Sequence, residues 1–375
     1  MMFTENLQDL IPAEKRLIPA DAKEYAFTGR IDFDVQNAPV FVFAGSAVTI
    51  RFTGTSAGIL IRNRRFYNNM EVGFLLDGAQ GKLSFDENDK AIYLPVAENL
   101  TDGTHELTVF KRQDATHCFA FFGAVLDADA CVLTPPPAAV RRMECYGDSV
   151  SAGAVSEAWD CAGAQDPPDT QGVFDNAFYS YAAITARNLG ASLHNVAQGG
   201  IAVFDHTGYY HAPDCIGMET AYDKLIYFPE GGVFPSGDGV FGMKAWDFAR
   251  YTPQAVLFAV GQNDPHREGF PDNDIRNSAY RASWKAAYKR ILTDLLGKYP
   301  RAHFVLLTTV LMHDAQWDAA IEEIRLELDS PRVSHFYFRR NGAATPGHPR
   351  ITEQYEMAEE LTAYLSAMGD ALWAD

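Results

Sequence analysis

The sequence predicts two domains, an all-β sandwich followed by an α/β/α domain built around a central parallel sheet. Three observations predict this division. The chain has 375 residues, which is long for a single hydrophobic core. Short runs rich in β-branched and aromatic residues fill the first third, and strand-like runs alternate with helical patterns in the rest. A proline run sets the boundary, so we expect the domains to be residues 1–137 and 138–375.

The first domain is expected to be a β-sandwich because its apolar runs are short and are separated by turns. Asp77-Gly78 and Asp102-Gly103 are dipeptides typical of tight turns and hairpins. Regularly spaced short strands of this kind are typical of sandwiches and barrels. The predicted strands cover residues 40–43, 47–52, 58–61, 71–76, 106–111 and 118–125.

The tetrapeptide TPPP at residues 134–137 predicts a linker, because proline cannot donate to a sheet and stiffens the chain. After it, strands alternate with helices, which predicts a parallel sheet covered on both faces. In such sheets the functional residues collect in the loops that follow the strands. The predicted strands are 140–146, 192–197, 255–260, 303–307 and 333–338, and the predicted helices are 177–189, 278–299 and 351–365.

Residues 208–245 have no clear period and are rich in Gly, Pro, Tyr and Phe. A loop of this length inside a compact domain is uncommon and is often functional. Two interpretations stay open: a lid or substrate wall, and a purely structural excursion.

Composition limits the partners and the compartment. A formal net charge of −18 repels phosphate backbones and anionic lipids, so we expect no nucleic acid or membrane partner. Five cysteines without a C-x-x-C pair favour buried free thiols in a reducing compartment. The first ten residues contain Glu5 and Asp9 and no apolar core of a signal peptide. We therefore expect a cytoplasmic protein, or a secreted one if a leader has been removed.

The first loop with candidate chemistry is Gly147-Asp148-Ser149, which follows a predicted strand and precedes a helix. A serine at that place lies near backbone N–H groups, which suits a nucleophile whose attack creates an oxyanion. By itself the tripeptide is also typical of a turn with an N-cap serine. A phosphate-binding loop is excluded because no Gly-Lys-Ser/Thr follows.

Two further strand-end loops carry glycine and asparagine. Gly199-Gly200 follows the strand at 192–197, and adjacent glycines allow close backbone approach. Gly261, Asn263 and Asp264 follow the strand at 255–260. The Asn263 amide could donate to a developing oxyanion. Taken alone, the glycine pair is better explained by a plain strand-to-helix turn, and an Asx-turn is the alternative for Asn263.

A serine nucleophile needs a base, and ten histidines compete for that role. His348 lies in Gly347-His348-Pro349, directly before the C-terminal amphipathic helix. From there it could reach the same sheet edge as Ser149. His266 is the second candidate and could equally be a substrate contact.

The order Gly-Asp-Ser, Gly, Gly-x-Asn-Asp and a late histidine resembles the signature of the SGNH (GDSL-type) hydrolase superfamily. The resemblance covers residues 140–370. It implies a serine nucleophile at Ser149, a base at His348, and an oxyanion hole made by the Ser149 and Gly200 N–H groups and the Asn263 side chain. Gly199 is the alternative to Gly200.

The front of the chain is similar to the jelly-roll domain of carbohydrate esterase family 2. The segments that carry this similarity are GRIDF at 29–33, RFTGT at 51–55 and DGTHELTVFKR at 102–112, together with Trp246-Asp247-Phe248 in the second domain. The resemblance implies an acetyl esterase that deacetylates manno-, xylo- or gluco-oligosaccharides derived from hemicellulose such as xylan or mannan. It also implies that no metal or organic cofactor is needed.

Two other functions stay open. One is a lipase or esterase for small acyl esters on the same scaffold, and the other is a non-catalytic carbohydrate-binding protein. Aromatic side chains suit the apolar faces of sugar rings. The candidates for such contacts are Trp159, Tyr209, Tyr210 and Trp246, each of which could equally be a core residue.

The sequence departs from the superfamily pattern ahead of the histidine. The superfamily usually places an aspartate three residues before it, and this chain has Thr345 there. Threonine cannot carry the charge that stabilises an imidazolium. We therefore expect a Ser149–His348 dyad. A distant carboxylate is the alternative, and the sequence does not locate it.

Overall fold

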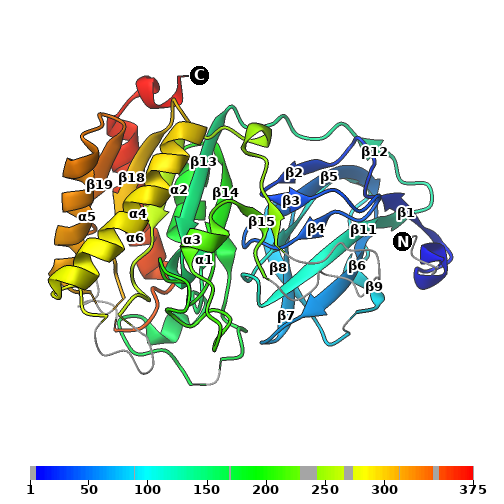
Figure 1. Cartoon of the computed structure of the whole chain (residues 1–375). Coiled ribbons are helices and arrows are strands. Elements are labelled where there is room, and N and C mark those ends of the chain that lie inside the picture. Colours follow the sequence, from blue (N-terminus) through cyan, green and yellow to red (C-terminus); the bar gives the residue numbers. More distant parts are fainter. Residues whose placement is uncertain are drawn as a thin grey trace. The chain divides into compact units, whose positions relative to one another are not determined.

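The computed structural model describes residues 6–87, 89–168, 170–228, 243–265, 273–311, 313–340 and 346–374. It divides the chain into two compact units. The first comprises the described residues up to Ala138 together with Gln171–Val173, Phe228 and Met243, and the second comprises the other described residues from Ala139 onward. Figure 1 colours the first unit from blue to cyan and the second from green to red. An antiparallel β unit is followed by a unit with a parallel sheet, which confirms the fold class predicted from the sequence.

The first unit consists of two antiparallel sheets. Its strands are β1 (Lys15–Pro19), β2 (Ala26–Thr28), β3 (Ile31–Asp32), β4 (Val40–Phe41), β5 (Ala47–Gly54), β6 (Ala57–Arg65), β7 (Met70–Leu76), β8 (Ala79–Phe85), β9 (Ala91–Ala97), β10 (Gly103–Lys111), β11 (His117–Asp127) and β12 (Val132–Leu133). One sheet has the order β3-β4-β11-β6-β9 with β1 paired to β11, and the other has the order β12-β5-β10-β7-β8 with β2 paired to β5.

Alternation of side chains along the strands builds the core of this unit. Ile50 of β5 is buried, while its neighbour Thr49 faces away and bonds Thr108 of β10 at 2.7 Å. Ile50 joins Ile59 and Phe119 of the other sheet in one hydrophobic cluster. The two sheets therefore share a core, as a sandwich requires.

The second unit is built on five parallel strands. These are β13 (Arg141–Gly147), β14 (Ala191–Ala197), β17 (Ala255–Ala259), β18 (His303–Leu307) and β19 (Val333–Phe336). Their order is β14-β13-β17-β18-β19. The principal helices are α1 (Ser149–Ala152), α2 (Tyr181–Asn188), α4 (Ser278–Lys298), α5 (Ala315–Leu328) and α6 (Ile351–Ala367).

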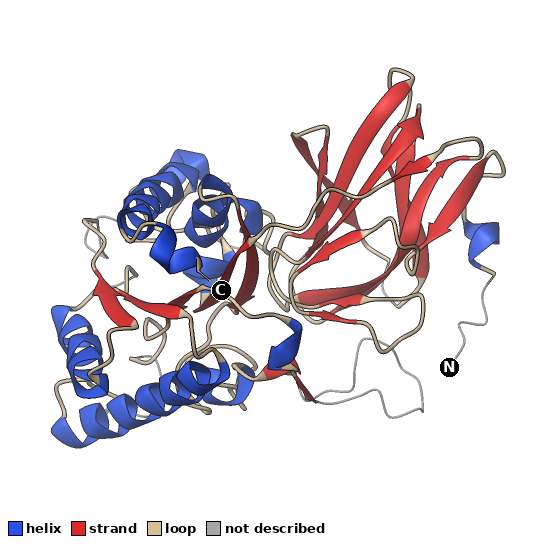
Figure 2. Cartoon of the chain, turned by 90° about the horizontal axis from the view of Figure 1, so that it is seen from above, coloured by secondary structure: helices blue, strands red, loops and turns tan. Residues whose placement is uncertain are grey.

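Helices cover both faces of this sheet (Figure 2). Met143 and Cys145 of β13 lie in one cluster with the apolar residues of α2 and α6. Tyr146 points to the opposite face, where its ring and that of Tyr288 in α4 both pack against Phe258 of β17. The alternating side chains of a strand with two buried faces produce this arrangement.

The register of the strands sets the position of the site. Gly147 at the end of β13 is the Cα partner of Ala197 in β14 and of Ala259 in β17. The carboxyl ends of three neighbouring strands are therefore level. The chain passes from β13 to β14 on one side and later to β17 on the other, which makes this edge a switch point of the topology.

The excursion at 208–245 is described only in part. It contains α3 (Met218–Ala221), β15 (Lys224–Ile226) and β16 (Lys244–Ala245), and the two strands pair antiparallel. Tyr210, Ile216 and Met218 are buried, so this part packs as structure. Residues 229–242, which the lid interpretation also needs, lie outside the described residues.

The structure adds two facts that bear on the composition. It describes all five cysteines and joins none of them in a disulfide, and Cys131 is exposed where we expected buried thiols. Among the described residues, no helix has both the length and the apolar character needed to cross a membrane.

Candidate active site

Ser149 begins α1 directly after the end of β13. Gly147 must lack a side chain, because a Cβ there would overlap the hydroxyl of Ser151. Asp148 is the N-cap residue, and its carboxylate accepts the Val150 N–H at 3.0 Å. Gly153 then ends the short helix with a φ of 77°. This tight strand–turn–helix segment fixes the Ser149 hydroxyl at the sheet edge.

His348 meets Ser149 across 199 positions of sequence. Its Nε2 lies 2.8 Å from Ser149 Oγ, within the reach of a general base that takes the hydroxyl proton. The histidine stands just before α6, whose N-cap residue Arg350 donates its N–H to Glu353 at 2.9 Å. The structure thus brings together the serine and the histidine that the sequence singled out.

Asp166 corrects the expectation of a dyad. Its Oδ2 lies 2.6 Å from His348 Nδ1, the nitrogen that faces away from Ser149. Burial on its own would raise the pKa of Asp166, but the hydrogen bond and charge of His348 and the guanidinium of Arg350 outweigh it. The pKa of Asp166 is therefore held below its usual range. Sequence reasoning missed this residue because it is 182 positions from its partner.

The N–H groups of Ser149 and Gly200 are available at the same edge. Neither has an acceptor among the residues that the structure describes. Gly200 has a φ of 76°, and a Cβ there would lie 2.9 Å from the Cβ of Tyr209. Only glycine fits this combination of backbone angle and close approach. Both N–H groups thus satisfy one requirement of an oxyanion hole.

Asn263 stands at the end of the β17 loop and is buried. One hydrogen of its side-chain amide is donated to the carbonyl oxygen of Ile201 at 3.0 Å. The amide carries two hydrogens, which leaves the second for a ligand. Gly200 and Asn263 are therefore held in one hydrogen-bonded unit.

The buried carboxylates of Asp148 and Asp264 connect these loops through hydrogen bonds. Asp264 accepts the Val203 N–H at 3.1 and 3.2 Å and the Trp284 indole N–H at 2.9 Å. Asp148 accepts the side-chain amide of Gln262 at 2.7 Å. Burial raises the pKa of Asp148 to about 6 and that of Asp264 to about 7, although these hydrogen bonds oppose the shift. The hydrogen bonds of the two carboxylates fix the loops relative to each other.

The other residues considered in the sequence analysis are the second candidate base, the residue three positions before His348 and the candidate sugar contacts. His266 and Thr345 lie outside the described residues. Tyr210 and Trp246 are each 5% exposed, so they are core residues and their assignment as possible sugar contacts is wrong. Trp159 and Tyr209 are 73% and 57% exposed.

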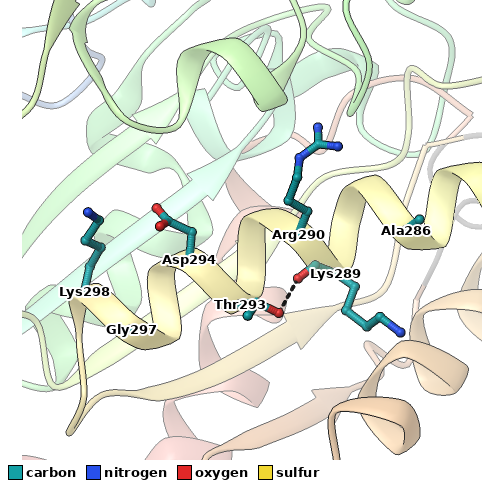
Figure 3. A pocket seen from close by; sticks show the side chains of 7 residues that line it. All are labelled: Ala286, Lys289, Arg290, Thr293, Asp294, Gly297 and Lys298. Atoms are coloured by element: carbon teal, nitrogen blue, oxygen red, sulfur yellow. Dashed lines mark hydrogen bonds between the residues drawn. The ribbon is translucent and has the colours of Figure 1, made fainter.

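A surface hollow lies along one side of α4 (Figure 3). Within it the Thr293 hydroxyl donates to the Lys289 carbonyl at 2.7 Å, an ordinary helical contact. Among the described residues, no group of three or more His, Cys, Asp or Glu side chains is arranged to hold a metal ion.

Comparisons with known proteins relate this chain to carbohydrate esterases. Residues 27–136 match the family described as carbohydrate esterase 2 N-terminal. The chain is 27% identical, over 90% of its length, to the cellulase/esterase CelE of Acetivibrio thermocellus, and it spans 38% of that relative. It is also 27% identical to the acetylxylan esterase / glucomannan deacetylase of Cellvibrio japonicus, over 72% of this chain and 68% of that protein.

A solved structure shows the same architecture. It is a family two carbohydrate esterase from Clostridium thermocellum in complex with cellohexaose, with 25% sequence identity and a TM-score of 0.73. The similarity covers 93% of this chain and 100% of that chain. These matches confirm the resemblance to carbohydrate esterase family 2 that the sequence predicts.

Proposed function

We propose that this chain, which is similar to a family two carbohydrate esterase over 93% of its length, is a serine esterase that removes acetyl groups from oligosaccharides. The observation that carries the proposal is the 2.8 Å contact between His348 Nε2 and Ser149 Oγ. It lies at the edge where the loops of three level strands meet. A serine paired with a base beside open N–H donors is suited to acyl transfer.

The first half of the reaction forms an acetyl-enzyme. His348 Nε2 accepts the proton of the Ser149 hydroxyl while Oγ attacks the acetyl carbonyl carbon. Negative charge then develops on the carbonyl oxygen, and the N–H groups of Ser149 and Gly200 with the Asn263 amide stabilise it. When the tetrahedral intermediate collapses, the imidazolium gives its proton to the departing sugar oxygen.

The second half regenerates the serine. Water attacks the acetyl carbonyl, and His348 accepts a proton from that water. The same three donors hold the second oxyanion. Acetate leaves, and Ser149 Oγ recovers its proton from His348. The proton that Ser149 gave to the sugar is thus replaced by one from water, and the acetic acid formed loses its own proton to the solvent.

The substrate class is proposed from the relatives and from exposed aromatic side chains. The two curated relatives are named for cellulase/esterase activity and for acetylxylan and glucomannan deacetylation. Tyr209 lies beside the oxyanion loop, since its N–H donates to the Gly200 carbonyl at 2.8 Å. Its ring is largely exposed. We place a sugar ring of an acetylated manno-, xylo- or gluco-oligosaccharide against this ring.

Mass spectrometry of acetylated oligosaccharides tests the proposal. We expect loss of acetyl groups from acetylated manno- or xylo-oligosaccharides with the parent enzyme, and none with Ser149→Ala. Preference for long chains in a series of 4-nitrophenyl esters would instead indicate a lipase. Oligosaccharide binding without acetate release would indicate a carbohydrate-binding protein.

A further inference from the structure

We propose that Asp166 is the positioning residue of a Ser149–His348–Asp166 triad, and that Arg350 holds its carboxylate against the imidazole. The acid thus comes from the loop that follows the nucleophile, rather than from the position three residues before the histidine. This inference rests on the proposed function, because it assigns a role within the same reaction.

The two carboxylate oxygens of Asp166 have different partners. Among the described residues, the hydrogen-bond partner of Oδ2 is the imidazole, with 2.6 Å to His348 Nδ1. Oδ1 accepts the backbone N–H of His348 at 2.8 Å and lies 2.8 Å from Nη2 of Arg350. Since both partners of Oδ1 are donors that carry no lone pair, only an acceptor fits there. The carboxylate therefore has one orientation.

Arg350 connects the loop of the acid to the loop of the base. Its side chain is fully buried. Besides Asp166, the guanidinium donates to the carbonyl oxygens of His348 and of Gln165, the latter at 3.4 Å. A guanidinium keeps its charge at every pH relevant to the enzyme. It can thus hold Asp166 ionised and in place whether or not His348 is protonated.

Two backbone features allow this approach. A Cβ on Gly347 would lie 2.5 Å from Asp166 Oδ1 and 2.7 Å from the carbonyl oxygen of Ala164. The loop before the histidine can therefore come this close only with glycine at that position. On the other side, Asp166 precedes Pro167-Pro168, and a residue before proline is confined to extended conformations. Both loops are thus shaped for the contact.

The chemical role follows from the tautomer. A carboxylate at Nδ1 requires a proton on that nitrogen, which leaves the lone pair of Nε2 directed at Ser149. When Nε2 takes the serine proton, the negative charge of Asp166 stabilises the imidazolium. Asp166 itself gains no proton.

Asp166→Asn is a discriminating variant because Oδ1 faces two donors. The amide oxygen of the asparagine must take that place, which puts its NH₂ group against His348 Nδ1. This favours the tautomer with a proton on Nε2, and such an imidazole cannot accept the Ser149 proton. We expect kcat for 4-nitrophenyl acetate to fall by about 10²- to 10⁴-fold. We expect KM to change little, because both carboxylate oxygens of Asp166 are engaged by His348 and Arg350.

The matched control is Asp160→Asn, which removes a charge from an exposed position on the same loop. Three readouts should separate the variants: kcat with KM, the rate at which a fluorophosphonate labels Ser149, and the low-field proton resonance of the His348 Nδ1–H. The Asp160 variant should match the parent in all three. The Asp166 variant should lose the resonance and label slowly while its circular dichroism stays unchanged.

Failure of the inference can be told apart from failure of the proposed function. If the parent releases acetate but Asp166→Asn keeps kcat within about threefold and keeps the resonance, the triad is wrong and the esterase stands. If the parent releases no acetate, the esterase is wrong. Labelling of Ser149 and the proton resonance then still decide whether Asp166 positions His348.

Discussion

Asn263 donates its side-chain amide to the carbonyl oxygen of Ile201 at 3.0 Å. Ile201 directly follows Gly200, so this bond joins two of the three loops at the sheet edge. One hydrogen of the amide is used for the scaffold and the other is available for an oxyanion. Asn263 thus has both a structural and a chemical contact, and their effects can be separated by mutation.

Asn263→Ala should lower kcat by about 10²- to 10³-fold, the usual effect of losing one oxyanion donor. The Ile201 carbonyl would also lose its partner, so we expect a modest decrease in thermal stability. Steady-state kinetics on 4-nitrophenyl acetate, paired with a thermal melt, measures both effects. An unchanged kcat would remove Asn263 from the oxyanion hole.

Asp264→Asn should destabilise the fold. Both carboxylate oxygens of Asp264 face N–H donors, from Val203 and from Trp284. An asparagine whose amide oxygen takes the place of Oδ1 still accepts both donors, but its NH₂ group then faces the Val203 N–H in place of Oδ2. Losing that hydrogen bond costs about 0.5–1.5 kcal/mol. Chemical denaturation followed by circular dichroism measures the loss. The exposed Asp214→Asn is the control and should leave the unfolding midpoint unchanged.

The loops of the site could be predicted because their signals are local. A run of apolar residues that ends in Gly-Asp-Ser or in Gly-Gln-Asn-Asp marks a strand end, and parallel strands bring such ends to one edge. Ser149, Gly200 and Asn263 are predicted in this way, whereas His348 is predicted from its place directly before the C-terminal amphipathic helix. The register of β13 with its two neighbours then makes the strand ends level.

Asp166 could not be predicted in the same way. No period relates a loop residue to a histidine 182 positions away, and the superfamily pattern points to Thr345 instead. The one local signal is an aspartate ahead of two prolines in the loop after the nucleophile. Only the fold shows that this loop returns to His348.

Strands with one solvated face were missed for a different reason. β8 has the sequence AQGKLSF. It contains no β-branched residue and one aromatic residue, Phe85, so the composition typical of a strand is weak. Its pairing with β7 over seven positions decides its conformation. Tertiary pairing outweighs local preference here.

The pH dependence of stability should report on the Asp166 carboxylate. The pKa of Asp166 is lowered in the fold from an ordinary value of 3.8. A lowered pKa means that the ionised form stabilises the fold, so this stabilisation is present above pH 3.8 and is lost as the pH falls below that value. Wild type should therefore melt above Asp166→Asn near neutral pH. The difference between the two melting temperatures should become smaller once the pH drops below 3.8.

Calorimetric melts of wild type and Asp166→Asn, recorded from neutral pH to below pH 3.8, show in which direction the difference in melting temperature changes. Asp160→Asn serves as the control, since its gap to wild type should be small at every pH. A gap between wild type and Asp166→Asn that widens on acidification would contradict the assignment of a stabilising ionised carboxylate.

Gly347→Ala tests the close approach of the two loops without removing any charge. The added methyl group would lie 2.5 Å from Asp166 Oδ1 and 2.7 Å from the Ala164 carbonyl, so one loop must move and the bond from Asp166 to His348 must lengthen. We expect kcat to fall by about 10- to 100-fold, because small displacements of a catalytic group have effects of this size.

Gly297→Ala is the matched glycine control. Gly297 is an exposed residue of α4, and a Cβ there meets nothing within 4 Å. Since alanine is the better helix former, this variant should keep full activity and gain about 0.5–1 kcal/mol of stability. Steady-state kinetics measures kcat of both variants, and chemical denaturation measures their stability. If Gly347→Ala is as active as Gly297→Ala, the Asp166 carboxylate does not depend on the approach of the histidine loop.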